Sequence, residues 1–278
     1  MKLNKMVTGT LFAAVTLLAI TGCGEQKSKD SLENIKDKGT LVVATSADYP
    51  PYEFLISEDS KNKIVGMDID LAEAIAKKLG VKLEIKNMQF DSVLASVSAG
   101  KTDIAISGFN ITEEHKKSFD FSISYYHSSQ VALINKKDAD KYTKLSNFSG
   151  KKIMTQQGSV CNDVAKKQLP DSQMITTDAV PNGVMQLQSG KVEAMILDIA
   201  VAKGYADNNP DLAISIAKFK EDGSEENGIV LPKNSGKLKK EIDAIVKEQV
   251  SSGKVKEYLK KNGKLQAQIA KDAMKGNQ

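Results

Sequence analysis

Polar groups follow two predicted buried strands at the point where each strand ends. Ser107 follows the apolar run 104–106, and Asp198 follows the apolar run 195–197. In parallel α/β sheets, ligands bind at the carboxyl ends of the strands. The first segment offers small hydroxyl, amide and backbone groups, whereas the second offers a lone carboxylate. A cleft between them could hold the two charged ends of a zwitterion. It contains no obvious nucleophile, so the pattern indicates binding.

Both segments end a helix–strand pattern that occurs twice in the chain. Residues 93–106 can be aligned with residues 183–196, and in both copies an amphipathic helix ends at Gly-Lys before an acidic residue and an apolar strand. The copies are too far apart for a solenoid repeat. We therefore expect one copy in each of two similar lobes, although a match this loose can also arise by chance.

Strands and helices alternate through the first part of the chain. Apolar runs and period-two alternation predict the strands, and apolar residues on one helical face predict the helices. Such alternation is typical of βαβ units and a mostly parallel sheet. The predicted elements are a strand at 41–44, a helix over 69–79 ended by Gly80, a strand at 81–86, a helix from Asp91 or Ser92 to Ala99, and a strand at 104–106.

The composition excludes several classes of protein. The 278 residues are 41% hydrophobic and 27% charged, which is typical of globular chains rather than disordered or collagen-like ones. The basic residues are all lysines, and the net charge of +4 is spread along the chain. This distribution argues against a nucleic-acid surface. Two cysteines and two histidines are too few for a disulfide framework or a structural zinc site, and we predict no metal and no cofactor.

The N-terminus has the pattern of an export signal. Lys2 and Lys5 precede the weakly polar and apolar run 7–20, which is shorter than the roughly 20 apolar residues of a membrane-spanning helix. Ile20-Thr21-Gly22-Cys23 resembles a bacterial lipobox. The resemblance implies a signal peptide over 1–22, a lipid on the Cys23 thiol, and a polar linker over 23–37. The mature protein would then be anchored at the extracytoplasmic face of the cell membrane.

Four segments resemble one known family. The mature chain is similar to the polar amino-acid binding proteins of ABC importers (family 3) from about Gly39 to Leu259. The segments are DYPPYEF at 48–54, GMDIDLA at 66–72, the stretch 107–126, and GKVEAMILD at 190–198.

The resemblance implies a two-lobed α/β fold of the periplasmic-binding-protein type II. Two crossovers, near 124–130 and 222–228, would form a hinge. The first lobe would comprise 38–126 and 225–278, and the second would comprise 127–224. Closure on one polar amino acid would present surfaces of both lobes to a membrane permease. The acidic candidates for the cleft favour a cationic or amide side chain over an acidic one, and we expect a monomer.

The resemblance also assigns a ligand site. The ligand's ammonium would meet Asp198, with the carbonyl or hydroxyl of Ser107 nearby. Its carboxylate would meet backbone N–H groups of Asn110 and Val160. The aromatic rings of Tyr49 and Phe90 would sandwich the ligand. The predicted ligand-binding residues are Tyr49, Phe90, Ser107, Gly108, Asn110, His115, Gly158, Ser159, Val160 and Asp198.

His115 departs from the family pattern. The family has an arginine there that grips the ligand carboxylate with two hydrogen bonds. Thr112 is expected to cap a short helix, which places His115 in the first turn, where the helix dipole disfavours imidazolium. We therefore expect a neutral ring in the free protein. If His115 gained a proton on binding, affinity would rise as the pH falls.

Several other acidic side chains have open assignments. Asp48, Glu53 and Glu226 could line a pocket for a cationic side chain or face water. Asp68 and Asp70 are expected to cap a helix or lie on its solvated face.

His127 could lie on the surface or on the cleft rim, and Cys161 is expected to be buried. A rival function is an enzyme on the same fold, such as a cyclic-acid dehydratase or a cell-wall lyase, with Asp198 and His115 as its acid–base pair. A third is a ligand-sensing subunit of a signalling receptor.

Overall fold

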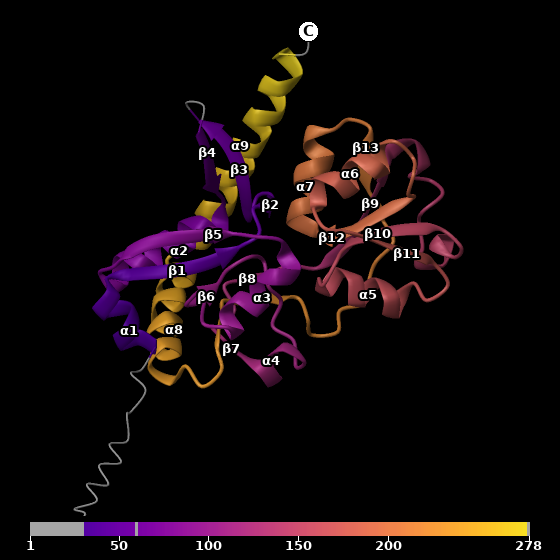
Figure 1. Ribbon diagram of the computed structural model, residues 1–278. Helices are drawn as coiled ribbons and strands as arrows, with labels where there is room; N and C mark the ends of the chain where they lie inside the picture. Colours follow the sequence, from indigo (N-terminus) through magenta and orange to yellow (C-terminus); the bar gives the residue numbers. More distant parts are fainter. Residues whose placement is uncertain (1–30, 59–60, 277–278) are drawn as a thin grey trace, which may run out of the picture.

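The computed structural model describes residues 31–58 and 61–276 and shows two α/β lobes side by side (Figure 1). The predicted signal peptide 1–22 and the lipidation site Cys23 lie outside the described residues. Part of the predicted linker 23–37 is folded: helix α1 (Ser31–Lys38) buries Ile35 in the core. Residues 31–37 of the predicted linker are therefore helical.

The first lobe is built on a five-stranded mixed sheet. Its strand order is β5-β1-β6-β15-β7, with β1 parallel to both β5 and β6 and β15 antiparallel to its neighbours. The strands are β1 (Thr40–Thr45), β5 (Lys82–Asn87), β6 (Ile104–Ala105), β7 (Phe119–Phe121) and β15 (Val230–Pro232).

The second lobe repeats this arrangement. Its order is β11-β10-β12-β9-β13, with β10 parallel to β11 and β12 and β9 antiparallel to its neighbours. Strands β6 and β12 hold equivalent central positions, so the two copies of the sequence pattern lie in equivalent places. The strands are β9 (Gln130–Asn135), β10 (Lys152–Gln156), β11 (Gln173–Thr177), β12 (Ala194–Asp198) and β13 (Leu212–Ile214).

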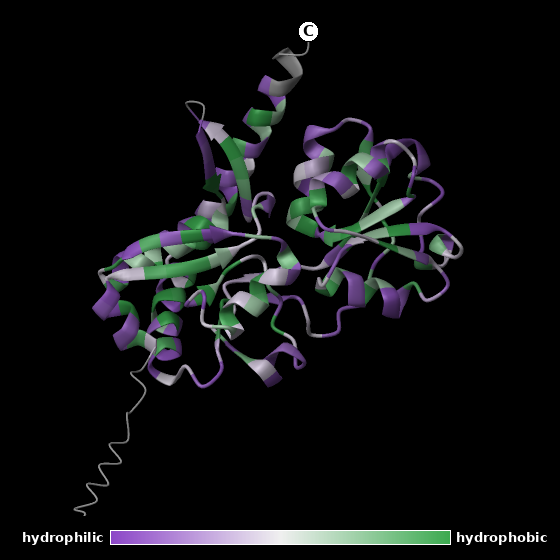
Figure 2. Ribbon diagram, viewed as in Figure 1, coloured by the Kyte–Doolittle hydropathy of each residue, from purple (hydrophilic) through white to green (hydrophobic). Residues whose placement is uncertain are grey.

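Amphipathic helices cover both sheets, and Figure 2 shows apolar residues concentrated in the strands with polar residues on the outer faces of the helices. Gly80 ends α2 in the left-handed conformation, as predicted. Helix α3 begins at Phe90, before the predicted start at Asp91 or Ser92, because the extended residue Gln89 takes the N-cap position. The helices of the first lobe, besides α1, are α2 (Met67–Leu79), α3 (Phe90–Ser98), α4 (His115–Ser118), α8 (Gly236–Ser251) and α9 (Lys254–Gly276); those of the second are α5 (Val160–Gln168), α6 (Val180–Gln188) and α7 (Ile199–Asn208).

Short elements complete the fold. Strands β2 (Asp48–Tyr49), β3 (Glu53–Glu58) and β4 (Lys61–Val65) form a small antiparallel sheet on the first lobe. Helix α9 packs on α2 and α8 and also contacts α7 of the second lobe. The 3-10 turns η1 (Lys136–Asp138) and η2 (Leu145–Phe148) belong to the second lobe. Among the helices in 31–58 and 61–276, none combines the length and the hydrophobicity needed to cross a bilayer.

Two crossovers connect the lobes as an antiparallel ribbon. Strand β8 (Tyr126–His127) pairs with β14 (Glu226–Asn227), and both lie where the chain passes between the sheets (Figure 1). A two-stranded connection of this kind allows the lobes to move as rigid bodies about a hinge.

Candidate functional site

One cavity lies between the lobes, at the carboxyl ends of β6 and β12. The structure brings all ten predicted ligand-binding residues to its wall. The residues that the sequence analysis did not assign to the site are Phe109, Gln156, Cys161, Ile196 and Leu197. Gln156 ends β10, the parallel neighbour of β12, so the rule that ligands bind at strand carboxyl ends could have identified it.

Asp198 is the buried carboxylate of this cavity. It is 2% exposed, and its Oδ1 accepts a hydrogen bond from Gln130 Nε2 at 3.3 Å, while Cys161 Sγ lies 4.0 Å away. Burial raises the pKa of Asp198 to about 7. No lysine lines the cavity in the part of the chain that the structure describes. The carboxylate is therefore available to a cation from outside the protein.

The alternative role for Asp198, capping a helix, uses a different part of the residue. Asp198 occupies the N-cap position of α7, but its side chain makes no capping hydrogen bond. Its backbone N–H donates to Tyr49 Oη across the lobes at 3.0 Å. The carboxylate thus takes no part in starting the helix.

Rings from two aromatic pairs of the first lobe line the cavity. Tyr49 stacks on Tyr52 with ring centroids 5.6 Å apart, and Phe90 stacks on Phe109 at 4.8 Å. Both Tyr49 and Phe90 line the cavity. Such ring faces attract cationic and planar groups.

The start of α5 supplies groups suited to an anion. Gly158 has a positive φ of 74°, and the Ser159 hydroxyl caps the helix by accepting a hydrogen bond from Asn162 N. The free N–H groups and the dipole of a helix N-terminus favour negative charge. Val160, the first residue of this helix, lines the cavity.

Two side chains of the first lobe add unused polar atoms to the same cavity. Asn110 Nδ2 and His115 Nδ1 are buried and have no hydrogen-bond partner. The backbone N–H of His115 donates to Thr112 Oγ1 at 3.1 Å, so Thr112 makes the predicted local contact. A buried polar atom without a partner costs free energy, which a bound ligand group that pairs with it would recover.

Ser107 and Gly108 are held from behind by two acidic side chains. The Ser107 hydroxyl donates to Glu53 Oε1 at 2.7 Å, and Gly108 N donates to Asp68 Oδ2 at 2.8 Å. The Ser107 hydroxyl is therefore already used, and the Ser107 carbonyl is the one of the two predicted groups that remains for a ligand. Asp68 is 0% exposed, so its expected place on a solvated helix face is wrong. Asp70 instead pairs with Lys261 at 2.5 Å.

The three acids considered for a cationic pocket do not line the cavity. Asp48 joins the lobes, because its Oδ2 accepts hydrogen bonds from Gln156 Nε2 at 3.1 Å and from Val180 N at 3.0 Å. Burial raises the pKa of Asp48. Glu53 is buried beside Ser107.

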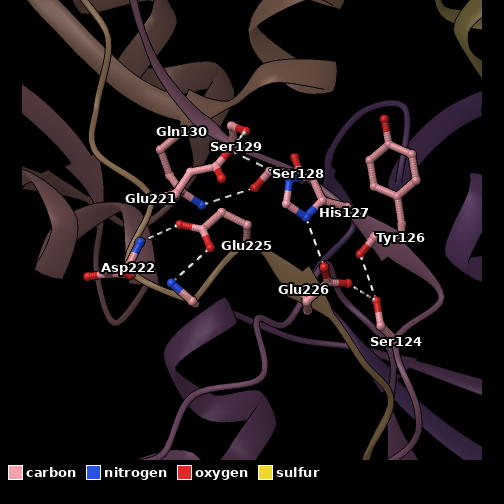
Figure 3. Close-up of polar contacts among 11 residues, drawn as sticks. Ser124, Tyr126, His127, Ser128, Ser129, Gln130, Glu221, Asp222, Glu225 and Glu226 are labelled. Atoms are coloured by element: carbon pink, nitrogen blue, oxygen red, sulfur yellow. Dashed lines mark hydrogen bonds and ion pairs between the residues drawn. The ribbon is translucent and has the colours of Figure 1, made fainter.

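Glu226 belongs to the crossover ribbon (Figure 3). Its Oε1 lies 2.9 Å from His127 Nδ1, and it also accepts a hydrogen bond from Ser124. This contact raises the pKa of His127. His127 is 52% exposed and lies on the ribbon rather than in the cavity. The first crossover, which contains His127, continues into Gln130, whose amide reaches both Ser128 O and Asp198.

A wider groove forms the mouth of the cavity between α4 and α5. Its two lysines are each paired with an acid: Lys116 with Glu113 and Lys167 with Asp222, both at 2.7 Å. The further acids leave the groove with an excess of negative charge. They are Glu114, Asp163 and Glu226.

Comparisons with known proteins agree with this geometry. Residues 41–264 match the family model of bacterial extracellular solute-binding proteins, family 3. A solved amino acid ABC transporter substrate-binding protein from Streptococcus pneumoniae Canada MDR_19A, bound to L-arginine, is 42% identical with a TM-score of 0.83, covering 85% of this chain and 98% of that one. The arginine-binding extracellular protein ArtP of Bacillus subtilis is 32% identical over 90% of this chain and 95% of its own length. A probable histidine-binding protein of Neisseria gonorrhoeae is 31% identical over 98% and 100%.

Proposed function

The chain belongs to the bacterial extracellular solute-binding proteins of family 3, and we propose that it is the receptor of an ABC importer for arginine or another cationic amino acid. Its fold is the two-lobed α/β periplasmic-binding-protein type II fold, as predicted. Members of this family are solute-binding proteins, not enzymes, and the acid–base role considered for Asp198 and His115 is not proposed further.

The observation that carries the proposal is the buried carboxylate of Asp198. It lies in the cavity with only neutral partners among the described residues, namely the Gln130 amide, the Cys161 thiol and the Tyr49 hydroxyl. A carboxylate in such a place is costly unless a cation pairs with it. The α-ammonium of an amino acid supplies that cation and three N–H donors.

The other end of the ligand would be held by donors. In the proposed pose, its carboxylate lies at the N-terminus of α5 near Ser159 and Val160, with Asn110 Nδ2 and His115 as further donors. A single imidazole and backbone amides then take the role of the arginine in the family pattern. Tyr49 and Phe90 would cover the ligand.

Two observations support a cationic side chain. The solved relative at 42% identity holds L-arginine, and ArtP is named as arginine-binding. In addition, the unbalanced acids at the mouth, Glu114 and Asp163 among them, would raise the local concentration of a cationic ligand.

Binding would act through the hinge. The ligand's two ends are satisfied together only when both lobes converge, so occupancy favours the closed arrangement. The closed form would present surfaces of both lobes to a membrane permease.

The lipid anchor at Cys23 is part of this proposal. It rests on the lipobox-like sequence 20–23. Expression of the full chain with radiolabelled palmitate should label the wild type and leave Cys23→Ser unlabelled. Equal labelling of both proteins would refute a lipid anchor at Cys23.

The experiment that tests the function is a calorimetric titration with the twenty amino acids and two arginine analogues. Arginine should have the highest affinity of the twenty, or an affinity similar to that of the other cationic amino acids. 5-Guanidinopentanoate, which lacks the ammonium, and agmatine, which lacks the carboxylate, should each bind at least about 100-fold more weakly. Binding of neutral amino acids alone would refute the cationic specificity. Binding of no amino acid would refute the function.

A further inference from the structure

Behind the cavity, two acidic side chains lie in contact with each other. Glu53 in β3 and Asp68 in α2 are 1% and 0% exposed, and their carboxyl groups lie close enough to act on each other's pKa at hydrogen-bonding range. Two carboxylate anions cannot hydrogen-bond, since neither has a proton to donate. The contact therefore requires one proton on the pair.

The outer oxygens of the pair receive all the surrounding donors. Asp68 Oδ2 accepts from Gly108 N at 2.8 Å and from the Tyr125 hydroxyl at 2.9 Å. Glu53 Oε1 accepts from the Ser107 hydroxyl at 2.7 Å. The other oxygen of each group, Asp68 Oδ1 and Glu53 Oε2, is buried and has no hydrogen-bond partner. A proton held between the two carboxyl groups would supply the missing partner.

The surroundings do not favour a second negative charge. In the described part of the chain, the titratable groups that act on the pair are Asp48, Tyr52, Tyr125 and Asp198. Each of these is neutral or negative, so none stabilises a second carboxylate. Burial raises the pKa of both Glu53 and Asp68.

The donors also indicate which residue holds the proton. Asp68 accepts two hydrogen bonds on its outer oxygen, whereas Glu53 accepts one, so the negative charge is better stabilised on Asp68. We infer that Glu53 is protonated at neutral pH, that it donates to Asp68, and that this pair positions the Ser107–Gly108 segment for the ligand. The positioning role rests on the proposed function, whereas the protonation state does not.

The pair is well placed to act on the site through its neighbours. Ser107 and Gly108 line the cavity, and Gly108 has a positive φ of 59° that its contact with Asp68 fixes in place. Tyr125 leads into the crossover ribbon, and its backbone N donates to Asn227 O. Neither Glu53 nor Asp68 touches the cavity, so both are positioning residues.

Glu53→Gln is the sharpest test, because glutamine has the shape of a protonated glutamate. Its amide N–H can replace the hydroxyl toward Asp68, and its oxygen can accept from Ser107. We expect the variant to bind arginine within about threefold of the wild type, which is less than the loss of one buried hydrogen bond. A loss of tenfold or more, or failure to fold at pH 7, would overturn the assignment.

The pH dependence of stability distinguishes a Glu53 that is protonated in the folded protein from one that is ionised. A folded-state pKa raised above the unfolded value gives stability at low pH that is lost as the pH rises through the folded-state pKa. The melting temperature of Glu53→Gln, relative to the wild type, should therefore increase with pH. A difference that is constant across the pH range would contradict the inference.

Infrared spectroscopy of the full chain in detergent reads the proton directly. The wild type minus Glu53→Gln difference at pH 7 should contain the carbonyl band of a protonated carboxylic acid. In the matched variant Asp68→Asn, the asparagine amide can donate to Glu53, so this band should vanish and the melting temperature should fall further than in Glu53→Gln. A larger fall in melting temperature for Glu53→Gln than for Asp68→Asn would place the proton on Asp68 and overturn the assignment. Both measurements are made without ligand, so they stand even if arginine does not bind.

Discussion

Asp68 and Asp198 are both almost completely buried, and they differ in their partners. Asp68 accepts hydrogen bonds from Gly108 N and the Tyr125 hydroxyl and contacts Glu53. Asp198 accepts long hydrogen bonds from Gln130 and the Cys161 thiol and is also in hydrogen-bond contact with the Tyr49 hydroxyl, and all three partners are neutral. The first carboxylate is satisfied by its own lobe and fixes a loop. The second lacks a counter-charge and is suited to bind one, which shows that partners rather than burial separate a structural acid from a binding acid.

The same contrast holds between the lobes. Strands β6 and β12 occupy equivalent positions in two sheets of the same order. At the end of β6, the Ser107 hydroxyl and the Gly108 N–H are held by acids behind them, whereas β12 ends in a carboxylate with no cationic partner among the described residues. One architecture therefore carries two chemistries, and a zwitterion needs both.

The largest effect should come from Asp198→Asn. Removing the counter-charge of a bound ammonium should weaken arginine binding by roughly 100-fold or more, as measured by calorimetry. The free variant should melt at a higher temperature than the wild type at pH 8, because an unpaired buried charge is gone. Asp163→Asn at the mouth is the matched control and should change affinity far less. Near-native arginine binding by Asp198→Asn would contradict the assignment of Asp198 as a binding acid.

Asp68→Ala should lower the stability of the protein. The change leaves Gly108 N, the Tyr125 hydroxyl and Glu53 without their partner, so we expect a loss of about 3 kcal/mol in the free energy of unfolding. Urea denaturation measures this loss. Asp70→Ala, which removes an ion pair with Lys261 and one of the two hydrogen bonds donated by Asn262 Nδ2, should cost less, about 1–2 kcal/mol. Equal losses would show that Asp68 has no special structural role.

The pH dependence of affinity should follow Asp198. A bound ammonium stabilises the carboxylate and lowers its pKa, so binding releases a proton when the pH is below the free value of about 7. Arginine affinity should therefore fall as the pH is lowered from 7 to 5, by at most about tenfold per unit. A proton gained by His115 would act in the opposite direction, so His115→Gln should make the fall steeper or leave it unchanged. Affinity that strengthens on acidification would favour His115 as the dominant group.

Gln130→Leu should produce the smallest change. The amide donates to Asp198 at 3.3 Å, a long bond whose loss should weaken arginine binding by about fivefold. The free protein should show a further rise in the pKa of Asp198, measured by NMR titration. An unchanged pKa would show that this contact does not orient the carboxylate.

The sequence was sufficient to predict those parts of the molecule that depend on local pattern. The helix end at Gly80 follows from glycine's access to positive φ, and the cavity residues after β6 and β12 follow from their position at strand ends. The contact between Glu53 and Asp68 could not be predicted in this way, because it joins a hairpin to a helix through the tertiary fold. The same is true of Asp48, whose partners Gln156 and Val180 belong to the other lobe.

Asp198 is proposed as the counter-charge for the ligand's ammonium. A crystal structure of the protein with bound arginine would show this contact or its absence. We expect the ammonium nitrogen within hydrogen-bond distance, about 2.7–3.2 Å, of an Asp198 oxygen, with the ligand carboxylate at the start of α5. Arginine bound with its ammonium in solvent, or with its carboxylate beside Asp198, would contradict the account.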